Sequence, residues 1–405
     1  MIKQKLKKTE IGMIPKDWEV NKVIDLFEIE TGTTPSTKDT SYWKGGTISW
    51  ITPADITNLD NSIELPDSKR KITKKALEET NLKIMPLGSI VISTRAPVGY
   101  VGIVKKELTF NQGCKGLIPK DDKKINTKFY TYYFVSKKEY LNNISGGSTF
   151  KELSKDALAK LEVPMPPLPE QQAIANILST VDNSIALVER ETVVLERLKR
   201  GVMKELFGKK EWQRIKFEEI CVKIKSGGTP LTSRKDYYKG NIPFVKIEDI
   251  TKAGKYLNET QIKISENGLN NSTTWLVPKG SLLLAIYGSI GEIAINKIDV
   301  ATNQAILGIV VNPNKADAEY VYYFFKNTKL ARYAKQSTQA NLTAEIIKSI
   351  EIPLPPLEEQ KRIAQILSTL DNKLAIQQSK KSKLERVKKS LMNDLLTGKK
   401  RVQYE

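Results

Sequence analysis

The chain has 405 residues, of which 40% are hydrophobic and 27% are charged, a composition typical of a globular protein long enough for two or more domains. Its formal net charge of +19 comes from lysines spread along the chain, which favours a polyanionic partner, with nucleic acid expected before anionic lipid. There is no histidine, which excludes histidine-based acid–base catalysis, histidine metal sites and Ser-His-Asp or Cys-His nucleophile systems.

Other classes are disfavoured by what the sequence does not contain. Residues 1–8 are basic but lack the apolar core of a signal peptide, and the most apolar run, residues 281–287, is too short to span a bilayer. Cys114 and Cys221 lie in regions that do not correspond, so no disulfide framework is expected. Neither a phosphate-binding loop nor a dinucleotide-binding glycine pattern is present. The sequence predicts a cytoplasmic protein with no visible catalytic constellation.

The same elements follow one another in both halves of the chain, at an offset of about 190 residues, which predicts two duplicated modules rather than a solenoid. Each module opens on a tryptophan, Trp18 or Trp212, which we expect to be a packing anchor. A loop rich in hydroxyl groups and glycine follows, as Thr-Gly-Thr-Thr-Pro at residues 31–35 and Ser-Gly-Gly-Thr-Pro at residues 226–230. Two aromatic residues and a Lys-Gly turn come next in both copies.

These loops are candidates for contact with phosphate groups. Hydroxyl groups and lysines bind phosphate oxygens, and glycine lets a backbone approach closely. The alternative is that the loops are surface turns with ordinary turn chemistry, but their recurrence in a basic protein favours contact. The candidate DNA-binding residues in these loops are Thr33, Thr34, Lys44, Thr229, Arg234 and Lys239.

Each module is also expected to contain short strands, including a central one where a turn precedes a continuous apolar run. Residues 129–135 and 320–325 are crowded with Tyr and Phe, which is more typical of a buried helix face than of a platform for stacking bases. The expected strands are residues 48–56 and 86–93 in the first module and residues 242–250 and 278–285 in the second, the later pair being central.

The two copies differ just after the central strand, where the first has Arg95 and the second has Tyr287. Arg95 is predicted either to bind guanine O6 and N7 or to pair with a carboxylate, and Tyr287 is a further candidate contact. Asn-Gln then recurs at residues 111–112 and 303–304. Amides can pair with adenine, but recurrence in both copies favours a shared structural turn. Lys115, which opens the next apolar strand, completes the candidate set.

Each module ends in a proline-rich stop followed by a long predicted helix. The stops are Val-Pro-Met-Pro-Pro-Leu-Pro-Glu-Gln from residue 163 and Ile-Pro-Leu-Pro-Pro-Leu-Glu-Glu-Gln from residue 352. Proline holds the chain extended, so the helices should begin near Glu170 and Glu359, whose carboxylates suit a helix N-terminus. Apolar residues then recur every seven positions, which predicts coiled-coil helices of roughly 35 to 40 residues, about 55 Å long.

The two predicted helices are expected to pack against each other, antiparallel if an internal dyad relates the modules. Their core is predicted to contain Ile174, Val181, Val188, Leu195 and Val202 from the first helix and Ile363, Leu370, Leu384 and Leu391 from the second. The neighbouring seam positions are predicted to be Ile177, Leu178, Ile185, Leu198 and Leu206 in the first helix and Ile366, Leu367, Leu374, Val387 and Leu395 in the second.

The middle of the second helix is polar, with Gln377, Lys380 and Lys381 where the first helix carries Glu189 and Glu191. These opposite charges are predicted to help fix the register of the pair. The other interpretation is a solvated helix face.

The twice-repeated proline and glutamine signature, followed by Ile-x-x-Ile-Leu-Ser-Thr-x-Asp-Asn and by Leu-Glu-Arg-x-Lys, resembles the specificity subunit of a type I restriction-modification enzyme. The resemblance covers essentially the whole chain. It implies a mixed α/β fold class with two tandem globular target-recognition domains, separated and followed by long α-helices that pack as an antiparallel coiled coil. The expected domains are residues 1–166 (first target-recognition domain), 167–208 (central helix), 209–355 (second target-recognition domain) and 356–405 (C-terminal helix).

The resemblance also implies a role. Such a subunit reads a bipartite double-stranded DNA site, docks two modification (methyltransferase) subunits and restriction subunits, and catalyses nothing itself. S-adenosylmethionine, ATP and magnesium would be cofactors of the partner subunits, with no cofactor or metal in this chain. Two alternatives remain, namely an orphan DNA-binding subunit without restriction partners and a coiled-coil scaffold whose basic surface serves protein assembly.

Overall fold

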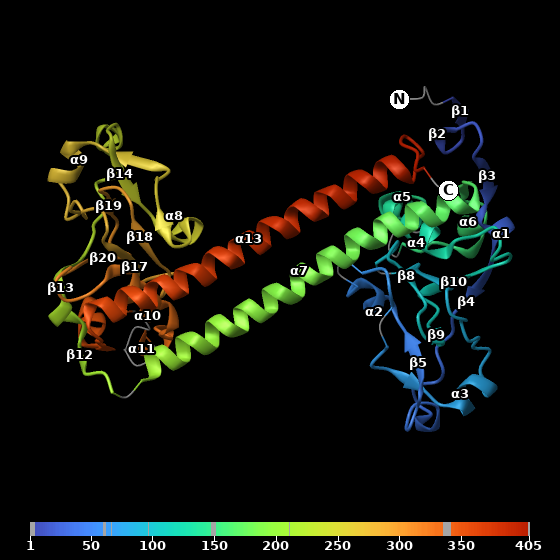
Figure 1. Cartoon of the computed structure of the whole chain (residues 1–405), viewed down its shortest axis with the longest axis horizontal. Helices are drawn as coiled ribbons and strands as arrows, with labels where there is room; N and C mark the ends of the chain where they lie inside the picture. The colour runs from blue at the N-terminus through green and yellow to red at the C-terminus, as the bar shows by residue number, and fades with distance from the viewer. Residues whose placement is uncertain are drawn as a thin grey trace. The chain divides into compact units, whose positions relative to one another are not determined.

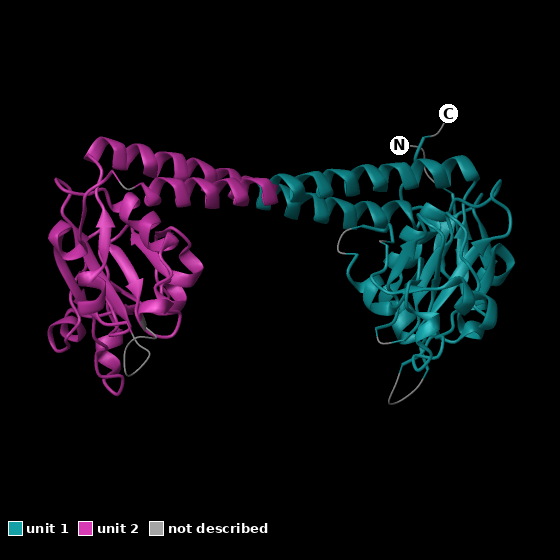
Figure 2. Cartoon of the chain, turned by 90° about the horizontal axis from the view of Figure 1, so that it is seen from below, with its two compact units in different colours: residues 1–191, 377–405 teal, residues 192–376 magenta. Residues whose placement is uncertain are grey.

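The structure is a computed structural model that describes residues 5–59, 62–65, 67–95, 97–146, 151–209, 211–334 and 342–403. The chain forms two compact units, residues 1–191 with 377–405 (unit 1) and residues 192–376 (unit 2) (Figure 2). Two long helices, α7 (Leu168–Gly208) and α13 (Leu357–Leu395), are divided between the units, so that one part of each helix belongs to unit 1 and the other part to unit 2. The predicted mixed α/β class, with two globular modules and two long helices packed together, is confirmed.

The globular module of unit 1, the first module, has two larger sheets, and the strand pairs β1-β2 and β3-β11 lie outside them (Figure 1). One has the strand order β4-β10-β7-β8 with antiparallel neighbours, and the other has the order β6-β5-β9. The strands are β1 (Leu6–Thr9), β2 (Gly12–Pro15), β3 (Glu19–Lys22), β4 (Phe27–Thr31), β5 (Ile48–Ile51), β6 (Lys71–Ile72), β7 (Ile90–Ser93), β8 (Val101–Ile103), β9 (Leu108–Phe110), β10 (Cys114–Pro119) and β11 (Glu162–Met165). The helices are α1 (Val23–Leu26), α2 (Pro53–Thr57), α3 (Lys74–Glu79), α4 (Thr127–Ser136), α5 (Lys138–Asn143) and α6 (Lys155–Ala159).

The globular module of unit 2, the second module, repeats this plan. Its sheets have the orders β13-β20-β17-β18-β15 and β16-β14-β19, so β15 is added at one edge. The strands are β12 (Arg214–Lys216), β13 (Cys221–Ser226), β14 (Ile242–Val245), β15 (Tyr256–Leu257), β16 (Ile262–Ile264), β17 (Leu282–Ala285), β18 (Ile293–Asn296), β19 (Ala301–Thr302), β20 (Ile306–Val311) and β21 (Glu351–Pro353). The helices are α8 (Ile247–Ala253), α9 (Glu266–Asn270), α10 (Ala318–Asn327), α11 (Ala331–Ala334) and α12 (Ala344–Ser349).

The expected central strands and aromatic helices are present. β7 and β17 are interior strands whose residues are all buried, and α4 and α10 bury their tyrosine and phenylalanine side chains in the core. The prediction of strands over residues 48–56 and 242–250 is wrong in its second half. Each strand stops after four residues, and a helix, α2 or α8, begins.

A cap at the start of each of these helices explains the early stop. The Asp55 carboxylate accepts hydrogen bonds from the Thr52 N–H at 2.8 Å and from the Thr52 hydroxyl at 2.7 Å, and Pro53 occupies the first helical turn. In the second module the Asp249 carboxylate accepts from the Lys246 N–H at 2.8 Å. An aspartate at the third helical position satisfies a backbone donor only if the chain turns into a helix, which ends the strand.

The repeated glutamine at the start of each long helix is fully buried and holds its own module. The Gln171 amide accepts a hydrogen bond from the Asn126 N–H at 2.8 Å and donates to the carbonyls of Lys124 and Pro166, at 3.0 and 2.8 Å. Gln360 makes the same three bonds with Asp317, Lys315 and Pro355. Because a buried amide must satisfy all its polar atoms, this network fixes where each helix leaves its module.

Within each unit, a repeated Asp joins the module to both long helices. In unit 1 the Tyr132 hydroxyl donates to Asp182 of α7 at 2.6 Å, and Lys388 of α13 pairs with the same carboxylate at 2.6 Å.

In unit 2 the Tyr323 hydroxyl donates to Asp371 of α13 at 2.8 Å, and Lys199 of α7 pairs with Asp371. Each long helix therefore supplies the aspartate in one unit and the lysine in the other. Because the aspartate comes before the lysine in both helices, these two pairs can form together only if the helices are antiparallel.

The predicted coiled-coil core residues differ in burial. Ile174 and Val188 of α7 and Ile363 and Leu370 of α13 are buried, whereas Val181, Leu195, Val202, Leu384 and Leu391 are half-buried. The prediction that Leu198, Ile366 and Val387 lie in the seam is wrong, because each is at least 41% exposed. Two helices cover only a narrow stripe of each other, which leaves flanking positions open to solvent.

The predicted pairing at the polar centre is present in unit 1. Lys381 pairs with Glu189 at 2.8 Å, and the Gln377 amide donates to Glu191 at 2.8 Å, whereas Lys380 is exposed. Whether these contacts set the register stays a prediction. Among the described residues, no helix combines the length and the apolar character needed to cross a membrane.

The chain that follows α13 returns to the start of the first module. The Arg401 guanidinium donates two hydrogen bonds to Asp17, at 2.8 and 2.7 Å, and two to the fully buried Glu170, at 2.6 and 2.8 Å. Trp18, which is fully buried, also donates its indole N–H to Glu170 at 2.9 Å. These contacts join both ends of the chain to the start of α7, an arrangement that the sequence analysis did not predict.

Candidate nucleic-acid interface

The candidate site of the first module is built around the turn at residues 111–113, between β9 and β10. The Asn111 side chain accepts from the Gly113 N–H at 3.0 Å, which shapes the turn and leaves Gln112 exposed at its tip. The Thr34 hydroxyl is hydrogen-bonded to the Gln112 side-chain carbonyl. A Cβ on Gly32 would lie 2.2 Å from the Asn111 carbonyl oxygen, so only glycine lets this loop approach the turn.

The second module builds the same arrangement. The Asn303 side chain accepts from the Ala305 N–H at 3.1 Å, and the Thr229 hydroxyl bonds the Gln304 side-chain carbonyl at 2.6 Å. A Cβ on Gly227 would lie 1.9 Å from the Thr302 carbonyl oxygen. The Asn-Gln repeat is therefore a shared turn, and in both modules a threonine orients an exposed glutamine whose NH2 group can donate to a ligand.

The segment after each central strand lies beside this turn. In the first module the Arg95 N–H donates to the Gly113 carbonyl at 3.2 Å, and in the second the Ile286 N–H donates to the Ala305 carbonyl at 2.9 Å. One surface in each module is thus formed by three segments. They are the Thr-containing loop (residues 31–35 or 226–230), the Asn-Gln turn and the segment that follows the central strand. The structure brings Thr33, Thr34 and Arg95 together in this way, and likewise Thr229 and Tyr287.

Two predicted arginines have carboxylate partners. Arg95 pairs with Glu152 at 2.9 Å, which is the second of the two roles expected for it. Arg234 makes two hydrogen bonds of 2.9 Å to Asp236. A guanidinium held by a carboxylate must give up that partner before it can bind a base.

The remaining candidates differ in accessibility. Lys115 in β10 is only 5% exposed, and burial lowers the pKa of its ammonium group. Lys44 and Lys239 are exposed, each after a short 3-10 helix, and Tyr287 is 40% exposed. DNA contact by these residues stays a prediction.

The sequence analysis missed Arg70, which lies just before β6. Its guanidinium carbon is 4.5 Å from the ring centroid of Trp50 and 4.9 Å from that of Trp43. The two indole N–H groups donate to the backbone carbonyls of Thr33 and Ser36, both at 3.0 Å. The only available signal was scarcity, because residues 1–166 contain just two arginines, Arg70 and Arg95.

Arg70 borders an open hollow of about 510 Å³ that is also lined by Lys44, Trp43, Thr37 and Thr40. The two charged residues in this lining are both cations, and no described carboxylate pairs with either of them. A surface of this kind attracts anions.

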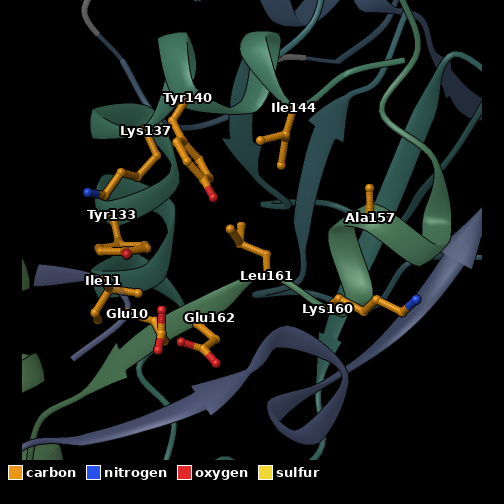
Figure 3. A pocket seen from close by; sticks show the side chains of 10 residues that line it. All are labelled: Glu10, Ile11, Tyr133, Lys137, Tyr140, Ile144, Ala157, Lys160, Leu161 and Glu162. Carbon is orange, nitrogen blue, oxygen red and sulfur yellow. The ribbon is translucent and has the colours of Figure 1, made fainter.

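A second hollow, of about 860 Å³, has a different character (Figure 3). Its lining combines two glutamates, Glu10 and Glu162, with two lysines, Lys137 and Lys160, so its formal charges balance. The described residues also contain no group of three or more Cys, Asp or Glu placed to hold a metal ion. The basic hollow at Arg70 is therefore the better candidate for binding a polyanion.

Comparisons with known proteins agree along the length of the chain. Residues 15–197 and 209–386 match a family model described as the type I restriction modification DNA specificity domain. The specificity subunit of the type I restriction enzyme MjaIX from Methanocaldococcus jannaschii is 30% identical over 426 residues, which cover 98% of this chain and 96% of that protein. The EcoKI specificity subunit from Escherichia coli K12 is 22% identical over 399 residues, 89% and 83% of the two chains.

A solved structure has the same fold. The type I restriction-modification S subunit from M. genitalium matches with a TM-score of 0.61 at 19% identity, over 97% of this chain and 98% of that one.

Proposed function

The chain belongs to the type I restriction-modification DNA specificity family, and from this premise we propose that it reads a bipartite duplex DNA site, one half with each module. The observation that carries the proposal is the duplicated surface, in which Thr34 with Gln112 and Thr229 with Gln304 occupy equivalent places. A net charge of +19 supports it, since each phosphate contact needs a cation or a donor.

The chain acts, in this proposal, as the non-catalytic subunit of a larger enzyme. Two modification subunits would methylate adenine with S-adenosylmethionine, and restriction subunits would use ATP and magnesium. Apolar side chains left exposed on the long helices support docking of partners there. They are Leu187 and Val387 in unit 1 and Val193, Val194, Leu198, Ile366 and Ile376 in unit 2.

The proposal is tested by producing the chain with its modification subunits and mapping methylated adenines on genomic DNA. We expect a split motif with two defined halves and an unspecified spacer. A single continuous motif, or no motif, would contradict it. A complex purified from the source cells that contains modification subunits and no restriction subunits would identify an orphan system, and binding to DNA that does not weaken with salt would favour the scaffold alternative.

The long helices are proposed to set the spacer between the half-sites. Inserting one heptad into α7 and one into α13, at facing positions, preserves the seven-residue period and adds about 10 Å of helix, close to three base pairs. The preferred spacer should lengthen by about that amount while the bases of both halves stay the same. A changed base identity would refute this role of the helices.

A further inference from the structure

We propose that Arg70 is a base-reading residue of the first module, which binds a guanine through O6 and N7 while Trp43 and Trp50 hold its guanidinium in place. The inference deepens the proposed DNA-reading function and rests on it. It names one chemical contact and one half-site.

The geometry of the two rings leaves the guanidinium ready to bind. The indoles meet edge to face, with centroids 5.1 Å apart and planes at 86°, and the Arg70 guanidinium lies within 5 Å of both centroids. Stacking restrains the side chain without using its N–H donors, and no described residue accepts a hydrogen bond from the guanidinium. The indole N–H bonds to Thr33 and Ser36 fix the rings to the Thr-containing loop.

Arg70 also differs from the other candidate arginines in its lack of a carboxylate. Arg95 pairs with Glu152, and Arg234 pairs with Asp236, whereas no described carboxylate lies within 4 Å of Arg70. Arg70 shares its hollow with Lys44, and two cations in one hollow attract an acceptor-rich ligand such as the guanine edge.

The duplication distinguishes base reading from phosphate contact. In the first module the backbone N–H of Trp50 donates to the backbone carbonyl of Arg70, so these residues face each other where β5 pairs with β6. In the equivalent sheet of the second module the facing residues at that place are Phe244 and Ile262. The position of Trp43 is taken by Tyr238. A phosphate contact is useful in both modules, because the DNA backbone is the same at both half-sites. A cation present in one module only is what reading different bases requires.

The test uses the complex of this chain with its modification subunits and duplexes randomised in both half-sites. Arg70→Ala is expected to lower the preference for guanine at one position of one half-site by about 5- to 150-fold, the range of a bidentate contact, with the other half-site unchanged. Arg70→Lys keeps the positive charge but loses the paired N–H donors of the guanidinium. Its affinity for DNA should therefore be close to that of wild type, while its preference for guanine stays reduced. Lys74→Ala, which removes an exposed cation from α3 of the same module, is the control and should change no base preference.

Two results would overturn the inference. A loss of affinity that is equal for all sequences, with a salt dependence reduced by about one ion, would make Arg70 a phosphate contact. Unchanged binding would remove it from the interface. If Arg70→Ala fails to fold by circular dichroism, Arg70→Lys and Arg70→Gln carry the same comparison. A wild-type complex without any two-part preference would instead refute the proposed function.

Discussion

The first and second modules share a framework but present different chemistry on it. Both orient an exposed glutamine with a threonine, and both are tied to the long helices by a buried glutamine and a tyrosine–aspartate–lysine contact. At the place where the first module has Arg70 between two tryptophans, the second has Ile262 beside Phe244. The duplicated parts position the module and supply the contact that both candidate interfaces share, whereas the residue at the Arg70 position differs between the two interfaces.

The two module entrances differ as well, although the sequence repeats there. Trp18 is fully buried and bonded to Glu170, which Arg401 also binds. Trp212 is half-buried, and its ring lies 5.1 Å from the Lys209 ammonium. The difference arises because the described part of the tail that follows α13 packs at the first entrance, through Arg401. A residue that recurs in both modules therefore packs in the same way only if the residues that contact it from elsewhere in the chain also recur.

The largest expected effect concerns the shared aspartates. Asp182 and Lys388 have side chains 12% and 14% exposed, whereas Asp371 and Lys199 are 29% and 24% exposed. Asp182→Asn, which removes the carboxylate charge beside the mostly buried Lys388 ammonium, should lower the free energy of unfolding by about 3 kcal/mol. Asp371→Asn should cost about 1 kcal/mol, since solvent screens its pair. Denaturant unfolding followed by circular dichroism measures both.

The exposed Asp156 of α6 provides a control, because Asp156→Asn should change the free energy of unfolding by less than about 0.5 kcal/mol. Equal costs for Asp182→Asn and Asp371→Asn would show that burial does not distinguish the two contacts. Combining Asp182→Asn with Lys388→Met should recover part of the loss, since the buried ammonium that lost its carboxylate contact is then absent.

An intermediate effect is expected at the entrance that only the first module closes. Arg401→Ala removes four hydrogen bonds to two carboxylates and should lower the free energy of unfolding by about 2 kcal/mol. Glu211→Ala, at the corresponding place after α7, removes only an exposed ion pair of 3.7 Å and should have little effect. A similar cost for both substitutions would contradict the difference between the entrances.

The Arg401 effect should also depend on pH. Hydrogen bonds from Arg401 hold the pKa of Asp17 below its usual value. A carboxyl whose pKa is lower in the folded state stabilises the fold above its unfolded pKa of about 3.9, and this stabilisation is lost as the pH falls through the folded value. The difference between wild type and Arg401→Ala should therefore shrink below about pH 4. Unfolding curves at neutral and acidic pH test this, and a difference that widens in acid would refute it.

The smallest effect is expected at the shared threonines. Thr34→Val and Thr229→Val each free one exposed glutamine, and each should weaken binding of the complex to DNA by about two- to fivefold, the size of one ordinary hydrogen bond. Base preference should not change, because both modules have the same pair. Titration of a cognate duplex and a randomised duplex measures both properties. A change of base preference in either variant would make the glutamine a reader rather than a shared contact.

Much of the architecture was determined by the sequence itself, because its signals are local. Pro164, Pro166 and Pro167 prevent a helix from starting before Leu168, and the seven-residue apolar period favours a long helix for any chain that contains it. The duplication predicted the two modules, and the repeated turn at Gln112 and Gln304 followed from the same comparison. An overlooked local signal also existed, since the cap formed by Asp55 ends a strand that the apolar pattern extends too far.

The tertiary structure alone decided which side chains meet. Glu152 is far from Arg95 in sequence, and Arg401 is 384 residues from Asp17, so no local pattern indicates either pair. The same holds for Arg70, whose two tryptophans are brought to it by the pairing of β5 with β6. Periodicity and proline act through neighbouring residues, whereas charge pairing and stacking depend on how distant strands are placed. For that reason the sequence predicted the modules and helices of this protein but not that Arg95 and Arg401 pair with distant carboxylates while Arg70 lies against two tryptophans.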